Sequence, residues 1–288
     1  MRMPGIVAVV VAAAGMSWAA DTPRIDAAAL VRQTVDNETK AGDHTKFMFQ
    51  DRKQTPTGTS TKLIVETKEA TAGLVIAYDD KPLGPKQRQD ELRRVQRFID
   101  SPDELRKKAK QEKEDADRVT RIMRALPDAF VYRVVGEEQG TNSVGKAGAE
   151  LVKLSFEPNP KYDPPSRVEQ VLTAMHGYLL IDANQKRLAR IDGNLFKEVA
   201  FGWGILGHLD RGGHFLVEQG DVSNGHWDIT RMNLRFTGKI LLFKKLNIES
   251  QETYSGFRSV PPDLTFAQGV ELLKKQQDEI AENASGTK

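Results

Sequence analysis

Cysteine is absent from this chain of 288 residues. A disulfide framework, a thiolate metal site and a lipid-modified cysteine at a processing site are therefore excluded. No single sign of charge dominates either, because 42 Lys and Arg residues face 40 Asp and Glu residues and the two signs are mixed along the chain. Such a chain lacks the basic surface that tracks phosphates, which excludes nucleic acid as a partner.

Long apolar runs are missing after the first residues, and the mean hydropathy is −0.49. The exception is the run GIVAVVVAAAG at residues 5–15, which follows Arg2 and precedes the small residues Ser17 and Ala19. A positive start, a short apolar run and small residues at a cut site are typical of a signal peptide. The run is too short for a membrane anchor, which needs about 20 residues.

We therefore expect residues 1–19 to be a cleaved signal peptide. Residues 20–288 are then an exported, periplasmic domain that is soluble and has no transmembrane segment after cleavage. Without disulfides this domain depends on its hydrophobic core, and about 270 residues are enough to build one.

Helix signals occur near the start, in the middle and at the end of the chain. Apolar residues at helical spacing predict helices over residues 25–40 and 266–282. The densely charged segment of about 85–126 predicts two more helices, inserted between strands. The second begins after Ser101, where a serine cap, a proline at the first helical position and a glutamate three residues after the cap coincide. We expect this helix to end before Pro127.

Most of the remaining chain alternates with period two, as strands with one buried face do. Asn224-Gly225 is a strong hairpin signal, and Thr237-Gly238 predicts another turn. Between Ile229 and Met232 the apolar face switches sides, which predicts a β-bulge near Thr230-Arg231. The expected strands are residues 44–51, 62–67, 72–78, 130–137, 150–156, 175–181, 188–195, 199–209, 214–219, 227–236 and 239–254.

Together these elements predict an α+β fold in one domain. Its centre is a strongly curved antiparallel sheet, an incomplete β-barrel. An N-terminal helix, an inserted helical hairpin and a C-terminal helix accompany the sheet.

The chemical motifs are few. Residues 202–207, GWGILG, spell G-x-G-x-x-G, but a dinucleotide site needs a helix directly afterwards, and residues 208–213 cannot begin one. His208, His214 and His226 lie at expected strand ends with Asp210 and Glu218 nearby, yet no HExxH or close H-x-H pair occurs. No G-x-S-x-G is present either. We expect no catalytic residues, no cofactor and no bound metal, and therefore no enzyme.

One strand segment has two possible interpretations. Between Val199 and Ile205 bulky apolar residues alternate with glycines, which leave room for a close approach to the backbone. The approaching group is either a helix of the same chain, as ordinary packing, or an acyl chain, as a ligand. The second interpretation predicts a ligand-binding surface formed by Phe201, Gly202, Trp203, Gly204, Ile205, Trp227, Met232, Leu234 and Phe236.

The hairpin formed by YLLID at residues 178–182 and LARIDG at 188–193, within this order of elements, resembles the periplasmic lipoprotein-carrier superfamily, which includes the outer-membrane lipoprotein-sorting carriers. The resemblance implies an incomplete barrel that holds acyl chains in a concave apolar face. Residues 207–219 and 265–270 also resemble exported bacterial proteins of unassigned function. No arginine of this chain can be matched to an arginine with a known role in transfer by the carriers.

The function that we expect is therefore that of a non-enzymatic periplasmic carrier whose partners are lipid acyl chains or lipoproteins. The alternative is an envelope scaffolding protein that binds another protein through the charged helices at about 85–126.

Overall fold

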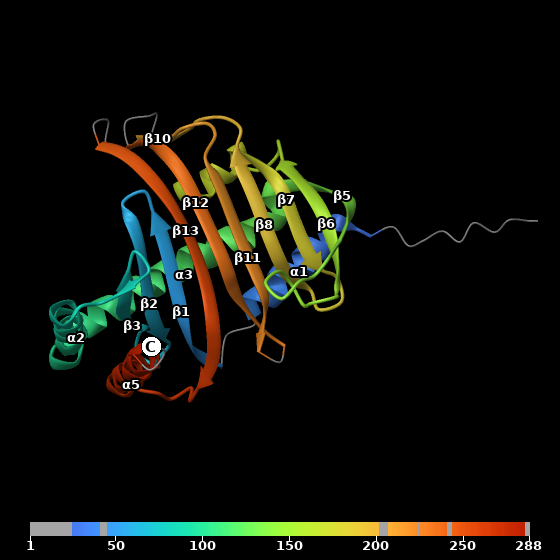
Figure 1. Cartoon of the computed structure of the whole chain (residues 1–288). Helices are drawn as coiled ribbons and strands as arrows, with labels where there is room; N and C mark the ends of the chain where they lie inside the picture. Colours follow the sequence, from blue (N-terminus) through green and yellow to red (C-terminus); the bar gives the residue numbers. More distant parts are fainter. Residues whose placement is uncertain (1–24, 41–44, 202–206, 224, 241–243, 286–288) are drawn as a thin grey trace, which may run out of the picture.

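The computed structural model describes residues 25–40, 45–201, 207–223, 225–240 and 244–285. Within them, thirteen strands form one antiparallel sheet that does not close on itself (Figure 1). The expected signal peptide lies outside the described residues. From edge to edge, the strands are β4 (Lys81–Pro82), β3 (Ala72–Tyr78), β2 (Gly58–Val65), β1 (Lys46–Thr55), β13 (Lys244–Val260), β12 (His226–Ile240), β11 (His214–Ser223), β8 (Arg187–Leu195), β7 (Met175–Asp182), β6 (Glu150–Pro158) and β5 (Phe130–Gln139). Two short strands lie off this path: β10 (Gly207–Leu209) pairs with β12 and also with β9 (Val199–Phe201).

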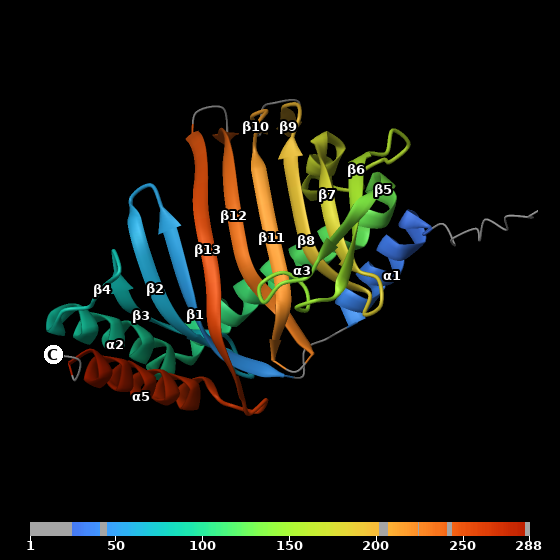
Figure 2. The same ribbon diagram turned by 45° about the vertical axis from the view of Figure 1, so that its right-hand side comes forward.

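The longer helices lie on different sides of this sheet. α1 (Ala27–Lys40) and α3 (Pro102–Ala129) cross one face, which we call the inner face, whereas α5 (Phe266–Ser285) lies near the lower ends of β1 to β3 on the other side (Figure 2). α2 (Pro85–Asp100) lies beside the β3 edge of the sheet. A short α4 (Arg167–Gln170) and a 3-10 turn (Val171–Ala174) precede β7. The predicted α+β fold, an open antiparallel sheet with leading, middle and terminal helices, is confirmed.

Buried apolar side chains form two large clusters at opposite ends of the sheet. The first cluster joins α1 and the end of α3 to β5 through β8 and includes Leu126, Phe156 and Leu179. The second cluster joins α2 and α5 to β2 and β3 and includes Val95 and Leu273. A third, smaller cluster lies under the loop after β5 and consists of Val144, Leu151, Leu180, Ala189 and Trp227.

α3 connects the two large clusters. Its 28 residues make it about 42 Å long, since a helix rises about 1.5 Å per residue. Leu105 and Ala109 pack against the second cluster, and Ile122 and Met123 pack against the first. The seven residues 113–119, which we call the bridge, are all exposed. The expected helical pair at 85–126 is therefore built into the domain at both ends of α3 rather than attached to its surface.

Local ion pairs stabilise the exposed part of α3. Lys113 pairs with Asp117 and Lys110 with Glu114, both at a spacing of four residues. Each such pair contributes roughly 0.2–0.5 kcal/mol to a helix. A helix that is polar on all sides and rich in such pairs can cross solvent between two packed regions, which is the arrangement here.

The expected bulge in β12 is present. Arg231 lies opposite Glu218 and Ile229 opposite Gln219, so Thr230 is the extra residue on its strand. The serine cap of α3 is also confirmed, because Ser101 Oγ accepts a hydrogen bond from the Glu104 backbone amide.

Two strand expectations and one helix end were wrong. β12 continues through Thr237-Gly238 to Ile240, so no turn interrupts it, and residues 239–254 are not one strand. A Cβ on Gly238 would lie 2.1 Å from the His208 carbonyl oxygen, so this glycine permits the close approach of β10 rather than a turn. α3 also continues past the buried Pro127 and ends at Ala129, although the proline cannot donate its helical hydrogen bond.

The expected strand over residues 199–209 is also wrong. β9 and β10 pair with each other in antiparallel fashion, with Phe201 opposite Gly207 and Val199 opposite Leu209. The chain therefore reverses direction between Phe201 and Gly207. The intervening residues, Gly202 to Leu206, lie outside the described residues. The strand β10 follows them, where a dinucleotide site would need the start of a helix.

Candidate functional site

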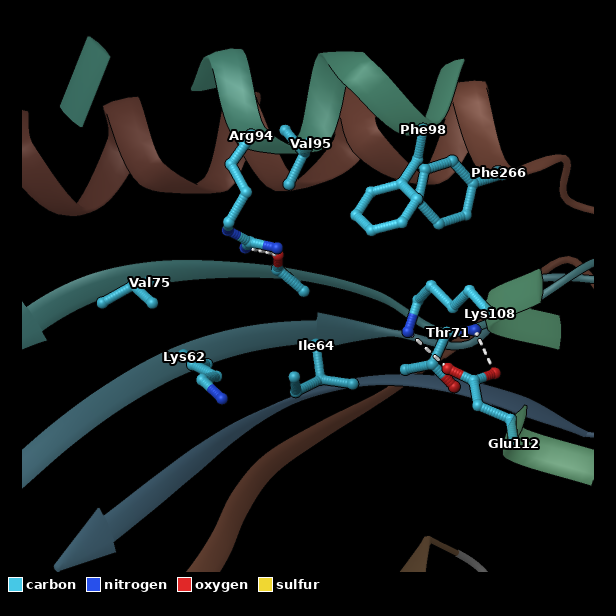
Figure 3. Close-up of a pocket in the computed structure, with 11 residues that line it drawn as sticks. Lys62, Ile64, Thr71, Val75, Arg94, Val95, Phe98, Lys108, Glu112 and Phe266 are labelled. Atoms are coloured by element: carbon cyan, nitrogen blue, oxygen red, sulfur yellow. Dashed lines mark hydrogen bonds and ion pairs between the residues drawn. The ribbon is translucent and has the colours of Figure 1, made fainter. Parts of the chain in front are cut away.

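A cavity of about 430 Å³ lies between α2, the first part of α3 and the inner face of β2 and β3 (Figure 3). Its size falls within the range of small-molecule sites, roughly 300–1,000 Å³. The strands form one wall, to which Ile64, Gly73 and Val75 contribute. Lys62 and Val75 are cross-strand partners, as are Ile64 and Gly73, so these residues share one face of the sheet.

The helices form the opposite wall. Val95 and Phe98 point from α2 toward the strands (Figure 3). Phe266, at the start of α5, meets Phe98 edge to face with ring centroids 6.0 Å apart. Leu63 and Val65 alternate with Ile64 and therefore face away from the cavity, toward the side where Gly269 of α5 contacts Val65. Each wall of the cavity therefore contributes apolar side chains, and the lining also includes the polar residues Lys62, Thr71, Arg94, Lys108 and Glu112.

Polar side chains near the cavity also cap the exposed edge of β3. Glu91 accepts a hydrogen bond from the Val75 backbone amide at 3.2 Å, and Arg94 donates to the Gly73 carbonyl at 2.7 Å. Glu112 accepts from the Thr71 amide at 2.9 Å. Edge strands carry unpaired backbone groups that invite pairing with other chains, and α2 and α3 satisfy them here.

The cations that line the cavity differ in their partners. Arg94 pairs with Glu91 at 2.9 Å, and Lys108 pairs with Glu112. Lys62 has no hydrogen bond or ion pair in the described part of the chain, although its charge influences Asp51, its cross-strand neighbour. The cavity therefore has one cation that is not neutralised by direct contact.

Beside the cavity, the inner face becomes polar over β1 and β13. We call this surface the polar belt; it consists of Asp51, Lys53, Lys62, Ser250, Glu252 and Tyr254, which the strand register places on one face. Glu252 is 7% exposed, pairs with Lys53 at 2.7 Å and accepts a hydrogen bond from the Tyr254 hydroxyl at 2.6 Å. Asp51 Oδ1 is buried and has no hydrogen-bond partner among the described residues.

The two carboxyl groups of the polar belt have pKa values shifted in opposite directions. Burial raises the pKa of Asp51, and the nearby charge of Glu252 raises it further against the smaller effects of Lys62 and Lys53. For Glu252, burial alone would raise the pKa, but hydrogen bonds from Lys53, Tyr254 and Ser250 outweigh it and the pKa is lowered. Burial and the hydrogen bond to Glu252 together raise the pKa of the Tyr254 hydroxyl. As the pH falls, Asp51 therefore takes up a proton before Glu252 does.

The described residues among those expected to bind a ligand are divided: Met232, Leu234 and Phe236 alternate along β12 and share its inner face, whereas Trp227 lies in another cluster. Phe201 and Phe236 pack against the first cluster, whereas Trp227 belongs to the third cluster and donates a hydrogen bond to Gln185 at 3.0 Å. Met232 and Leu234 are half-buried on the inner face, opposite Glu252 and Ser250 of the polar belt. Gly202, Trp203, Gly204 and Ile205 lie outside the described residues.

The histidines named in the sequence do not converge on one another. His214 pairs with Asp192 at 2.9 Å, and Glu218 pairs with Arg190 at 2.8 Å. His208 lies 3.2 Å from Asp210, and their ligand atoms lie within 4.8 Å of a carboxylate oxygen of Glu198, a grouping that spacing alone did not indicate. The Asp210 carboxylate also accepts a hydrogen bond from Thr237, so it already has partners within the protein, and no metal site is proposed.

Sequence reasoning did not find the cavity beside α2. The helical stripe of Leu92, Val95 and Ile99 was readable, and so was the apolar start of the last helix. Which face of which strands these helices cover depends on contacts between segments more than 150 residues apart, such as Phe98 with Phe266. No local pattern encodes such a contact.

No helix in the described residues combines the length and apolar character that crossing a membrane requires. No family model matches the chain, and no curated protein matches it. Among solved structures, a LolA superfamily protein from Nitrosomonas europaea matches 83% of this chain and 97% of its own, at 10% identity and a TM-score of 0.28. A TM-score this low carries no argument about function, so the geometry of the site has to carry it.

Proposed function

We propose that this protein is a non-enzymatic periplasmic binding protein that carries acyl chains of lipids or lipoproteins. The observation that supports this best is the cavity beside α2, which has apolar side chains on both walls and a volume suited to a small ligand. Burial of apolar surface contributes roughly 25 cal/mol per Å², so a flexible hydrocarbon chain gains free energy in proportion to the length that enters. The export signal that the sequence predicts places such a carrier in the envelope.

The site within this proposal differs from the surface expected from the sequence. An acyl chain lying along β12 would contact Met232 and Leu234 but would soon meet the buried carboxylate of Glu252, which pairs with the partly exposed Lys53. Displacing or desolvating such a pair is costly. The part of the cavity between Ile64, Val95 and Phe98 is apolar, and its ion pair of Lys108 and Glu112 lies beside Thr71, so we propose that the chain binds between the apolar residues.

The proposed test uses purified protein and a fluorescent fatty acid, dansylaminoundecanoate, whose emission increases in apolar surroundings. The wild-type protein should bind the probe, and mass spectrometry of an organic extract should show co-purifying lipid. Ile64→Trp should abolish binding, because the side chain of Ile64 is half-buried against the cavity and an indole there fills it. Circular dichroism and a thermal melt would verify that the variant is folded.

Met232→Trp is the matched control, since it adds the same group to the inner face outside the cavity. This variant should keep the probe. Loss of binding in Met232→Trp with retention in Ile64→Trp would move the site to the surface predicted from the sequence. Absence of both lipid and probe binding in the wild-type protein would refute the carrier proposal.

A further inference from the structure

We propose that the ligand of the cavity is a single-chain amphiphile with one anionic head group, a carboxylate, which pairs with Lys62. This inference rests on the proposed function and names the class of ligand. The tail lies between Ile64, Val75, Val95 and Phe98, and the head group meets Lys62 where the apolar wall adjoins the polar belt.

The balance of charge around the cavity supports an anion. Two of the three cations that line the cavity, Arg94 and Lys108, already have carboxylate partners in Glu91 and Glu112. Only the charge of Lys62 is without a direct partner in the described part of the chain. One negative charge on the ligand therefore completes the site, and a charge-assisted hydrogen bond to an ammonium group is roughly twice as strong as a neutral one.

The position of Asp51 makes the head group compete with the protein. Asp51 lies directly across from Lys62 on β1, and its Oδ1 is buried without a hydrogen-bond partner among the described residues. When ionised, Asp51 repels a bound carboxylate and attracts Lys62, which opposes binding. Burial first, and then the charge of Glu252, raise the pKa of Asp51, a shift in the direction that lessens this opposition. The other charged groups on this face are Lys53 and Glu252, which neutralise each other.

The geometry also limits the ligand to one chain. The cavity is enclosed by α2 on one side and by the strands on the other, and the polar belt borders it toward β13. A second chain would have to lie across Asp51, Lys53 and Glu252. A molecule with one tail and one charge therefore fits better than a two-chain lipid.

The test compares dodecanoate, dodecanol and dodecylamine as competitors of dansylaminoundecanoate on the full-length protein. In the wild-type protein dodecanoate should bind most tightly and dodecylamine most weakly. Lys62→Met should weaken dodecanoate roughly tenfold, as expected for the loss of one charge-assisted hydrogen bond, and leave dodecanol unchanged. Asp51→Asn should tighten dodecanoate and leave dodecanol unchanged.

Lys68→Met is the control for net charge, because Lys68 is an exposed lysine just after β2 that does not line the cavity. It should leave all three affinities unchanged. If Lys62→Met weakens the binding of dodecanoate and dodecanol equally, or weakens neither, Lys62 does not pair with the carboxylate head group. The carrier proposal stands in that case. Tighter binding of dodecylamine than of dodecanoate would overturn the anionic assignment. If none of the three displaces the probe, the proposed function fails together with this inference.

Discussion

The bridge of α3 offers a test of whether this helix crosses open solvent between the two large clusters. The substitution is Ala116→Gly, in the middle of seven consecutive exposed residues. If the bridge has no tertiary packing, only the intrinsic helix propensity changes, and the free energy of unfolding should fall by about 1 kcal/mol. For a domain of this size, such a loss lowers the melting temperature by roughly 2–4 °C.

Two further variants calibrate this expectation. Val119→Ala should change the stability very little or raise it slightly, because Val119 is 63% exposed and alanine is the better helix former. Leu126→Ala, in the same helix but 3% exposed in the first cluster, should cost about 2–5 kcal/mol. The measurement is urea denaturation followed by circular dichroism and by tryptophan fluorescence.

The result that would refute the reasoning is a loss well above 2 kcal/mol for Ala116→Gly, because it would require packing of the bridge against the sheet. A stronger perturbation, Ala116→Pro, should cost about 3 kcal/mol or more and kink the helix. Since Lys108 and Glu112 line the cavity, this variant should also weaken binding of the fatty-acid probe. Ala116→Gly should not.

Two other predictions concern the sheet. Gly238→Ala places a Cβ 2.1 Å from the His208 carbonyl oxygen and should lower the free energy of unfolding by about 1–3 kcal/mol in urea, whereas Gly84→Ala, whose Cβ would meet nothing closer than 3.6 Å, should be tolerated. Asp51→Asn should raise the stability at pH 7 and have little effect at low pH: the pKa of Asp51 is raised by folding, so ionisation opposes folding as the pH rises from its ordinary value through the raised one. Glu252→Gln should lower the stability at pH 7, and this effect should disappear as the pH falls through the lowered pKa of Glu252. Urea denaturation at several pH values between 3 and 7 measures the free energy of unfolding; if this reasoning is wrong, that free energy changes with pH equally in the wild-type protein and in both variants.

The sequence was most informative where a signal is local. Ser101 predicted the start of α3, and the switch between Ile229 and Met232 located the bulge at Thr230, because capping and strand phase depend on a few neighbouring residues. Gly238 was misread for the same reason. A glycine that begins a turn and a glycine that lets another strand approach look alike until the approaching strand is known.

The candidate site depended on information that no local pattern contains. The sequence predicted apolar strand faces and an apolar stripe on the helix at 85–100, but not that this helix would cap the β3 edge through Glu91 and Arg94. The polar belt was missed as well. Asp51 and Lys53 are in phase with Phe47 and Phe49, and the register places them on the inner face with Met232 and Val217, where polar side chains interrupt the apolar pattern.

The polar belt changes what the inner face can do. A curved sheet with one continuous apolar face would accept a long chain or several chains along its length, as the sequence led us to expect. Here the buried carboxylate of Glu252 and the partly exposed ammonium group of Lys53 lie on β13 and β1, between Met232 and Leu234 of β12 and the apolar residues of β2 and β3. Two separate apolar regions follow: one filled by α1 and the end of α3, the other left partly open beneath α2. The proposed ligand would therefore be held at one end of the sheet, with its tail away from the polar belt and its head group against it.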